Sequence, residues 1–393
     1  MPYIHTLPNW PNLTWRAELL ADRLASVRHR QGILTGKLQS LGIEIRREAS
    51  LASLTTEVVT SSAIEGERLP PDEVRSSIAR RLGLDAAGLV PSARRVDGVV
   101  EMMLDATREY QAPLTAERLL RWHSALFPTG LTGMRPITVG AWRTDALGPM
   151  QVVSGPLGNE RVHFEAPAAA RLPLEMQQFL DWLNAAEPMD PVIKAAVAHF
   201  WFVTIHPFDD GNGRIARAIA ELALARSDGT PDRFYSMSAQ IEAERNDYYR
   251  ALEFSQRADQ DITRWIEWFL GCLGRAFDRA EGTLARVFRD AAIWELANRS
   301  GVNERQRRVL TRVLGAWEGQ LTTSKYAMIA KCSSDTALRD IQALVEHRIL
   351  AKNPAGGRSV SYRLADTLPD DTSALRPSAP RPKSRGSPRL RTS

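Results

Sequence analysis

Residues 206–217 read His-Pro-Phe-Asp-Asp-Gly-Asn-Gly-Arg-Ile-Ala-Arg, and this stretch decides how the fold is interpreted. The apolar block 197–205 before it predicts a buried helix. Residues 215–225 predict a second helix, because they are rich in Ala, Ile and Leu and contain no Gly or Pro. The quoted stretch is therefore the loop between two helices, with Gly211 and Gly213 at the N-terminus of the second. Free N–H groups and the helix dipole favour a phosphate there. The two glycines also allow the backbone N–H groups to curl around a phosphate.

The side chains of the same stretch supply the other parts of a phosphate site. His206 is a candidate general base, because the imidazole pKa lies near neutral pH. Asp210 can hold a divalent metal ion, and Arg214 and Arg217 can neutralise phosphate charge. Taken singly, each feature has an ordinary explanation as a capping histidine, a Gly-Asn-Gly turn or a solvated pair of arginines. Their combination in this order favours the phosphate site.

This stretch resembles the signature of the Fic family, His-x-Phe-x-(Asp/Glu)-Gly-Asn-Gly-Arg-x-x-Arg. Every defined position matches: His206, Phe208, Asp210, Gly211, Asn212, Gly213, Arg214 and Arg217. Members of the family mostly transfer AMP from ATP to a hydroxyl group of a protein side chain. The resemblance implies that His206 accepts the proton of the attacking Ser, Thr or Tyr, and that Asp210 holds Mg²⁺ or Mn²⁺. It also implies an anion hole at Gly211, Asn212 and Gly213, with Arg214 and Arg217 on the outer phosphates. Asp209 is expected to be solvated.

A second motif lies upstream, at the end of a helix predicted to begin near Glu44. Ser61 and Glu65 are i, i+4 neighbours on one helix face, and Gly66 is a typical helix-ending residue. By itself this is an ordinary polar end of a helix. It also resembles the inhibitory motif (Ser/Thr)-x-x-x-Glu-(Gly/Asn) of many Fic proteins. That resemblance implies that Glu65 pairs with Arg217 and blocks the productive position of the γ-phosphate.

Residues 137–164 predict a β-hairpin between the two motifs. The expected arms are residues 138–143 and 151–153, the second ending at Ser154-Gly155-Pro156, because Val, Thr and Trp are bounded there by Gly and Pro. Fic proteins carry a hairpin flap in this place that presents the target segment as an added strand. The resemblance implies that Val152, Val153, Ser154 and Gly155 lie nearest to the nucleotide. A plain surface hairpin is the alternative.

Residues 238–262 resemble the family segment that lines the adenine pocket. The implied pocket residues are Tyr248, Tyr249 and Gln256, although the family pattern leads us to expect Asn in place of Gln256. An aromatic ring can stack on a base and an amide can bind its edge. The two tyrosines could equally be core aromatics.

Composition is that of an ordinary globular protein of two or three domains: 393 residues, 44% hydrophobic and 25% charged. The sequence contains no run of eighteen apolar residues, so it predicts no membrane helix. The N-terminal residues lack a signal-peptide pattern. Two cysteines, Cys272 and Cys332, argue against a disulfide framework and for a reducing compartment, so we expect a cytoplasmic protein. His123 and His199 lie in apolar helical patterns and are expected to be core or cap residues.

The C-terminal third predicts a different module. Residues 321–344 read as two short helices with Ser334 or a neighbour as the N-cap of the second, and with Leu338, Ile341 and Leu344 as its buried stripe. A Gly-rich turn and the alternating Val360, Tyr362 and Leu364 predict a wing, so the module resembles the winged-helix domain appended to many Fic proteins. Only Arg339 is an obvious base-reading side chain on the second helix, so DNA binding, dimerisation and another interaction all stay open. From residue 372 onward six basic residues and no acidic ones predict a disordered tail.

The predicted architecture is an all-α protein with a Fic-type helical core, a small β-hairpin flap and a C-terminal winged helix-turn-helix. Its predicted parts are an N-terminal helical domain with the inhibitory helix, a catalytic core, a connector, a winged helix and a basic tail, at residues 1–89, 90–280, 281–302, 303–365 and 366–393. The predicted activity is AMP transfer from ATP to a protein hydroxyl, including self-modification, restrained by Glu65. Three alternatives stay open: another nucleotide as donor, removal of AMP with Glu65 orienting a water, and a DNA-binding regulator with a sensory core. A homodimer is also left open.

Overall fold

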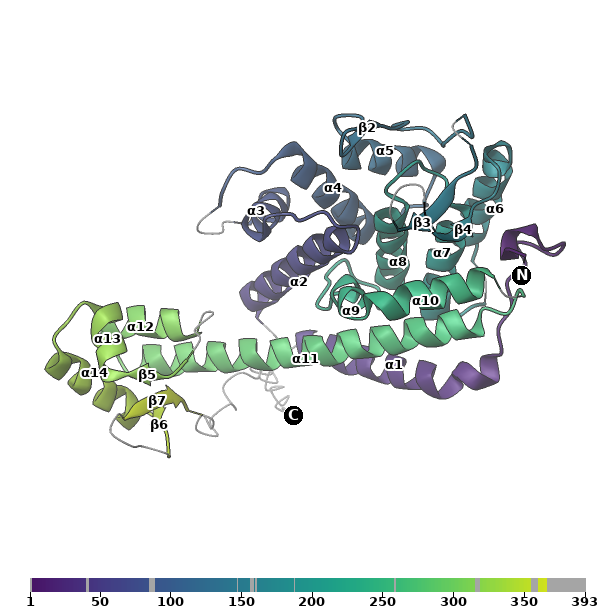
Figure 1. Cartoon of the computed structure of the whole chain (residues 1–393). Coiled ribbons are helices and arrows are strands. Elements are labelled where there is room, and N and C mark those ends of the chain that lie inside the picture. Colours follow the sequence, from purple (N-terminus) through teal and green to yellow (C-terminus); the bar gives the residue numbers. More distant parts are fainter. Residues whose placement is uncertain are drawn as a thin grey trace, which may run out of the picture. The chain divides into compact units, whose positions relative to one another are not determined.

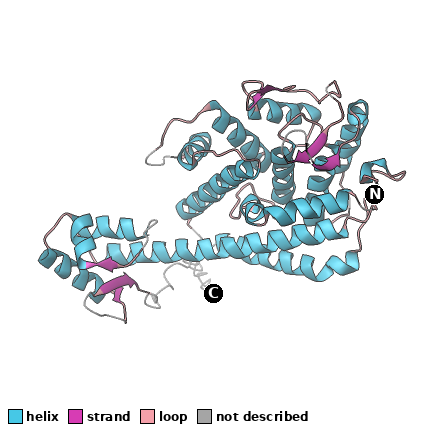
Figure 2. Cartoon of the chain, viewed as in Figure 1, coloured by secondary structure: helices cyan, strands magenta, loops and turns pink. Residues whose placement is uncertain are grey.

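The computed structural model of the chain describes residues 2–39, 42–84, 89–146, 148–155, 159, 161–186, 188–257, 259–314, 319–354 and 360–365. These residues are mostly helical, with a few short antiparallel strands (Figure 2). None of the helices in these ranges is long and apolar enough to cross a membrane. The chain forms two compact units, Met1–Leu284 and Ala285–Ser393.

The helices, two of them short 3-10 helices labelled η, are η1 (Ile4–Thr6), α1 (Ala17–Gln39), α2 (Ile43–Ile64), α3 (Pro71–Arg81), α4 (Arg94–Arg108), α5 (Ala116–Leu126), η2 (Ala169–Arg171), α6 (Leu172–Asn184), α7 (Pro191–Ile205), α8 (Asn212–Asp228), α9 (Met237–Ala243), α10 (Arg245–Gln256), α11 (Thr263–Arg299), α12 (Glu304–Leu314), α13 (Thr323–Ala330) and α14 (Ser334–Glu346). The strands are β1 (Leu131–Thr132), β2 (Arg135–Pro136), β3 (Gln151–Ser154), β4 (Arg161–Glu165), β5 (Leu321–Thr322), β6 (Leu350–Lys352) and β7 (Ser361–Leu364).

The two buried helices predicted on either side of the signature loop are present as α7 and α8, and they pack on each other (Figure 1). The Asp190 side chain caps α7 by accepting hydrogen bonds from the N–H groups of Val192 and Ile193. All but one of the residues from Val192 to Ile205 are buried, so this helix is apolar on every side. The helix ends at His206 in the left-handed region, with φ of 52°. Helix α8 begins after Gly211, which has φ of 82°. Both helix ends therefore meet in the signature loop.

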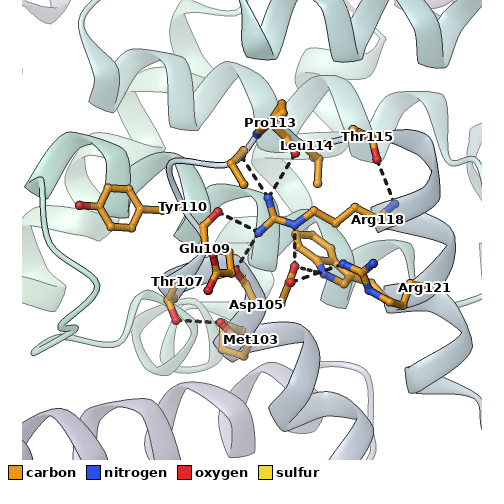
Figure 3. A network of polar contacts seen from close by, with 12 residues as sticks. Met103, Asp105, Thr107, Glu109, Tyr110, Pro113, Leu114, Thr115, Arg118 and Arg121 are labelled. Carbon is orange, nitrogen blue, oxygen red and sulfur yellow. Dashed lines mark hydrogen bonds and ion pairs between the residues drawn. The ribbon is translucent and has the colours of Figure 1, made fainter. Parts of the chain in front are cut away.

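A buried ion pair fixes the corner between α4 and α5. Arg118 donates from Nε to Asp105 Oδ2 at 2.6 Å and from Nη2 to the carbonyl oxygens of Asp105 and Glu109 (Figure 3). Trp122 donates from Nε1 to the same carboxylate oxygen of Asp105, also at 2.6 Å. Because these donors satisfy the carboxylate and the last carbonyls of α4, the corner is held rigidly. Helix α5 can then present His123 and Phe127 to the signature loop.

The β-hairpin forms, but its two strands are not the two that were predicted. Strand β3 pairs antiparallel with β4 and not with residues 138–143, which form no strand. The backbone N–H groups of Thr138, Gly140 and Arg143 are bound by Asp209 Oδ2 (2.9 Å), His123 Nδ1 (3.2 Å) and the Pro207 carbonyl (2.9 Å). Gly140 also has φ of 66°, outside the strand region. The segment is therefore a loop laid against the signature loop, and these three N–H groups are not available to a sheet.

The second unit has its own apolar core and a three-stranded sheet in the order β5-β7-β6. Ser333 caps α14 by accepting a hydrogen bond from the Thr336 N–H at 3.3 Å, at the position next to the predicted cap. The prediction for Leu338 was wrong, since its exposed fraction is 40%. Ala337, Ile341 and Leu344 form the buried stripe instead, because spacing of i, i+4, i+7 follows the helix face that meets the core. The Gly-rich turn at 355–359 and the predicted basic tail lie outside the described residues.

Candidate functional site

His206 is held at its ring by a backbone carbonyl and at its own backbone carbonyl by an arginine side chain. Its Nδ1 lies 3.1 Å from the Val203 carbonyl oxygen, which can only accept, so Nδ1 carries the proton and Nε2 keeps the lone pair. Arg143 donates from Nε to the His206 carbonyl at 2.8 Å and thereby supports the left-handed backbone. Burial and, to a smaller extent, Arg143 lower the pKa of His206 to about 4, although the Val203 hydrogen bond acts in the opposite direction. The imidazole is therefore neutral at pH 7 and able to accept a proton on Nε2.

The signature loop is closed by its own side chains. Asn212 accepts from the Phe208 N–H at 3.0 Å and donates to the Phe208 carbonyl at 2.8 Å, so its carboxamide braces the loop. His123 stacks on the Phe208 ring, with centroids 4.1 Å apart, and its Nε2 lies 3.3 Å from the Asp210 carbonyl. Asp209 was expected to be solvated but is half-buried and binds Thr138. These contacts hold the N–H groups at the start of α8 in a fixed array.

The Asp210 carboxylate points to the loop and to the small hairpin β1–β2. Its Oδ1 accepts from the Gly211 N–H at 2.5 Å, and its Oδ2 accepts from the Thr132 hydroxyl. Among the described residues no group of three or more His, Cys, Asp and Glu side chains forms a metal cluster. A single carboxylate of this kind fits a Mg²⁺ ion that takes its other ligands from water and nucleotide phosphates. The predicted role of Asp210 is thus chemically consistent with its surroundings.

Both arginines of the signature are buried and bound to carboxylates. Arg217 donates from Nη2 to Glu65 Oε1 at 2.8 Å, as the resemblance implied, and from Nε to the Ser61 hydroxyl at 2.9 Å. Burial is the largest single influence and lowers the pKa of Arg217, but Glu65, Tyr248 and Tyr249 together outweigh burial, so the pKa is raised. Arg214 pairs with Glu67 at 2.7 Å and lies 5.0 Å from the centre of the Phe127 ring. A Cβ atom on Gly213 would collide with Glu65 Oε1, so only glycine admits this approach.

A pocket of about 860 Å³ lies between the signature loop, the C-terminal end of α2, helix α10 and the β3–β4 hairpin. Its lining brings together nine of the predicted site residues: Glu65, Val152, Val153, Ser154, His206, Gly213, Tyr248, Tyr249 and Gln256. The other predicted residues do not line it: Ser61, Gly66, Gly155, Asp210, Gly211, Asn212, Arg214 and Arg217. Arg217 is separated from this space by the carboxylate of Glu65, which does line it. Such a volume fits a nucleotide-sized ligand.

The predicted adenine residues differ in their surroundings. Tyr248 is buried, with its hydroxyl 3.0 Å from His199 Nε2, so it serves as a core aromatic as well as a pocket wall. Tyr249 is exposed by 40%, and its ring is contacted by Tyr248 and by the Arg245 guanidinium, which lies 5.7 Å from the ring centre. Gln256 is buried and donates from Nε2 to the Thr204 hydroxyl at 3.3 Å. His199 is a core residue, as predicted.

Sequence reasoning missed several polar residues of the site. Glu57 is buried on α2 and accepts from the Ser236 hydroxyl at 2.7 Å and the Ser238 N–H at 3.0 Å, which fastens α2 to α9. The sequence feature that could have identified Glu57 is its position four residues before Ser61, because Glu57, Ser61 and Glu65 share one helix face. His163 of β4 lines the pocket and lies 3.0 Å from Glu253. It was missed because β4 was not assigned.

The comparisons with known proteins agree with this site. A sequence model of the Fic/DOC family matches residues 113–224, and one of a domain of unknown function, DUF4172, matches residues 3–84. Protein adenylyltransferase Fic of Drosophila yakuba is 26% identical over 260 residues, which are 65% of this chain and 47% of that protein. Protein adenylyltransferase Fic of Nematostella vectensis is 36% identical over 114 residues, 28% of this chain and 25% of that protein. The chain thus spans about half the length, or less, of these relatives.

Two solved structures share the fold. A Fic family protein from Desulfovibrio desulfuricans G20 matches with a TM-score of 0.50 and 22% identity, over 88% of this chain and 97% of that one. A Fic domain containing signaling protein from Bacteroides thetaiotaomicron matches with a TM-score of 0.50 and 19% identity, over 65% and 96%. At these identities the likeness concerns the fold. Together with the signature loop, the matches identify residues 113–224 as a Fic/DOC family domain, in a chain homologous to protein adenylyltransferases named Fic.

Proposed function

We propose that this chain is a protein adenylyltransferase that transfers AMP from ATP to a Ser, Thr or Tyr hydroxyl, its own included, and that Glu65 restrains it. The observation that carries the proposal is a neutral His206, with its lone pair on Nε2, on the wall of a nucleotide-sized pocket beside the glycine loop. The adenylyltransferase relatives support the choice of ATP as the donor.

The proposed reaction needs only one proton transfer by the protein. His206 Nε2 accepts the hydroxyl proton while the oxygen attacks the α-phosphorus of ATP, and the bond to the leaving diphosphate breaks. The Val203 carbonyl keeps the ring in the required tautomer, and the negative charges of Glu65 and Asp210 favour the imidazolium that forms. The N–H groups at the start of α8 stabilise charge on the phosphates. Mg²⁺ or Mn²⁺ bound at Asp210 would supply further neutralisation of that charge.

The hairpin is the proposed platform for the target. All four residues of β3 are exposed, and β4 is its strand partner in the described part of the chain. Val152 and Val153 are 37% and 47% exposed and line the pocket, so an added strand along β3 would pass close to His206. An edge strand with free N–H and C=O groups binds an extended peptide readily.

Labelled ATP separates this reaction from other transfers. The purified chain is incubated with ATP carrying label at the α or at the γ position, and protein-bound label is measured. Label retained from the α position alone supports AMP transfer. Label retained from the γ position means phosphorylation, and retention of neither, under conditions where Glu65 is replaced by glycine, contradicts the proposal.

Replacing Asp210 by asparagine tests the metal site. The amide keeps the size of the side chain but removes the charge that holds a hard cation. We expect transfer to fall and the Mg²⁺ concentration for half-maximal rate to rise about tenfold or more. Asp22→Asn, which removes the same charge from an exposed position on α1, serves as the control. An unchanged Mg²⁺ dependence in Asp210→Asn would assign the metal to other ligands.

The second unit supports a rival role, that of a DNA-binding regulator with a sensory Fic core. Residues 285–393 contain 20 Lys and Arg against 10 Asp and Glu, a net charge of +10, whereas the whole chain carries +5 and residues 1–284 therefore carry −5. The order α12-β5-α13-α14-β6-β7, with its three-stranded sheet, is consistent with a winged helix. If this rival is correct, the whole chain retards a random-sequence DNA duplex, and retardation weakens steeply as salt is raised. Unchanged duplex mobility at low salt would exclude it.

A further inference from the structure

Two carboxylates on either side of Gly66 contact the two arginines of the signature. Glu65 Oε1 lies 2.8 Å from Arg217 Nη2, and Glu67 Oε2 lies 2.7 Å from Arg214 Nη1. The arginines are i, i+3 neighbours on α8, so they share a face of that helix. The first pair was expected from the resemblance to the inhibitory motif. The second belongs to no part of that motif.

The end of α2 is built so that both carboxylates turn toward α8. Gly66 has φ of 83°, its N–H binds the Ala63 carbonyl at 2.9 Å, and the Glu67 N–H binds the Ser62 carbonyl at 3.0 Å. This is a glycine-terminated helix end, in which the left-handed residue reverses the chain and satisfies the last carbonyls. The reversal brings residues 65 and 67 to adjacent turns of α8. Leu69, which is buried, anchors the segment beyond them.

The two arginines are far more buried than the carboxylates that contact them, and they retain unused hydrogen-bonding capacity. The side chains of Arg214 and Arg217 are 6% and 2% exposed, whereas those of Glu67 and Glu65 are 28% and 31% exposed. Arg214 Nε and Arg217 Nη1 are buried without a hydrogen-bond partner among the described residues. A buried guanidinium N–H without an acceptor costs free energy. A phosphate group offers more acceptor oxygens than a carboxylate, so phosphates bound here can accept hydrogen bonds from Arg214 Nε and Arg217 Nη1.

We propose that Glu67 is a second phosphate mimic, which occupies Arg214 as Glu65 occupies Arg217. Segment 65–67 then stands in for two outer phosphates of a nucleotide, and a triphosphate has to displace both carboxylates. This inference rests on the proposed function, because it concerns the same nucleotide site. The part of the pocket around Tyr249 and Gln256 stays open in this state. The resting chain therefore discriminates by phosphate number: a nucleoside monophosphate binds unhindered, and a triphosphate is penalised.

A simpler account is that Glu67 only ties the loop after α2 to the core. The two accounts differ in what the loss of charge at Glu67 does to ATP. A loop anchor predicts lower thermal stability and no gain in ATP affinity. A phosphate mimic predicts tighter ATP binding that depends on Arg214.

The test is a double-mutant cycle read by calorimetric binding of ATP and AMP to the full chain. In Glu67→Gln we expect ATP to bind about fivefold tighter or more, the lower end of typical coupling between sites, and AMP to bind as in the wild type. In the Arg214→Ala background, Glu67→Gln should leave the ATP affinity unchanged. Glu101→Gln, which removes the charge of an exposed residue on α4, is the matched control. Glu67→Asp keeps the negative charge, so this variant should not show the gain in ATP affinity expected of Glu67→Gln.

Two results would overturn the inference. One is an ATP affinity that Glu67→Gln leaves unchanged in a folded protein, as judged by thermal unfolding. The other is an equal gain in the presence and absence of Arg214. The readout is binding, so it does not depend on transfer. Loss of α-label transfer with the ATP gain retained would reject the proposed reaction and leave the phosphate mimic standing.

Discussion

Replacing His206 by alanine is expected to lower AMP transfer by about 10²–10⁴-fold while ATP still binds. The ring is the proposed proton acceptor, and the Val203 carbonyl fixes the tautomer that leaves Nε2 unprotonated. The phosphate-binding groups lie on α8 and on the loop before it, so they survive the substitution. The measurement is the initial rate of self-labelling with α-labelled ATP, together with the ATP dissociation constant. Labelling at the wild-type rate would show that another group accepts the proton.

The pH dependence of the same rate provides an independent readout. Because burial and Arg143 lower the pKa of His206 to about 4, the basic form predominates above that pH and is lost below it. Because its pKa is lowered, His206 stays unprotonated, and the transfer rate is maintained, at lower pH than for an ordinary histidine. Protonation of His206 should therefore not reduce the wild-type rate between about pH 5 and 8. The control is His29→Ala, because His29 is an exposed histidine on α1. A wild-type rate that falls tenfold per unit below pH 6.5 would contradict the lowered pKa.

The parts of the site that could be predicted are those that local sequence determines. The signature loop follows from a buried helix, two glycines and a second helix, all within about thirty residues. The Glu65–Arg217 contact was expected from motif resemblance, although the two residues lie 152 positions apart and no spacing rule connects them. The left-handed geometry of Gly66 and Gly211 also follows from sequence, because glycine adopts it at little cost.

The parts that could not be predicted depend on contacts between distant segments. Residues 138–143 have strand-forming composition, yet Asp209 and His123 bind their N–H groups, and no local pattern reports such a competitor. The contacts by which the Asn212 carboxamide braces Phe208 had no signal in the sequence, and the anion hole at Gly211, Asn212 and Gly213 stays a prediction. Leu338 follows a plausible helical spacing, but the small Ala337 is the residue that meets the core. Glu67 lies just outside the recognised motif, so its contact with Arg214 had no signal in the sequence.

Glu65→Gly is expected to raise self-labelling strongly. The substitution breaks the 2.8 Å pair with Arg217 and frees a buried guanidinium to bind the γ-phosphate. A restraint of this kind shifts the resting equilibrium by about 1–3 kcal/mol, which corresponds to about five- to 150-fold in the competent population. The effect should require Arg217, so Glu65→Gly in an Arg217→Ala background should gain little. The measurement is the initial rate with α-labelled ATP at equal protein concentration.

The same substitution discriminates between restraint and hydrolysis as roles of Glu65. If the carboxylate only blocks the γ-phosphate, Glu65→Gly raises net labelling and does not slow the loss of AMP from protein labelled beforehand. If Glu65 orients a water for removal of AMP, that loss slows in the variant, because the water has no carboxylate to align it. Glu65→Gln separates the two further, since an amide weakens the pair with Arg217 but cannot act as a base. Equal or lower labelling in Glu65→Gly, with His206 intact and thermal unfolding unchanged, would reject autoinhibition by this residue.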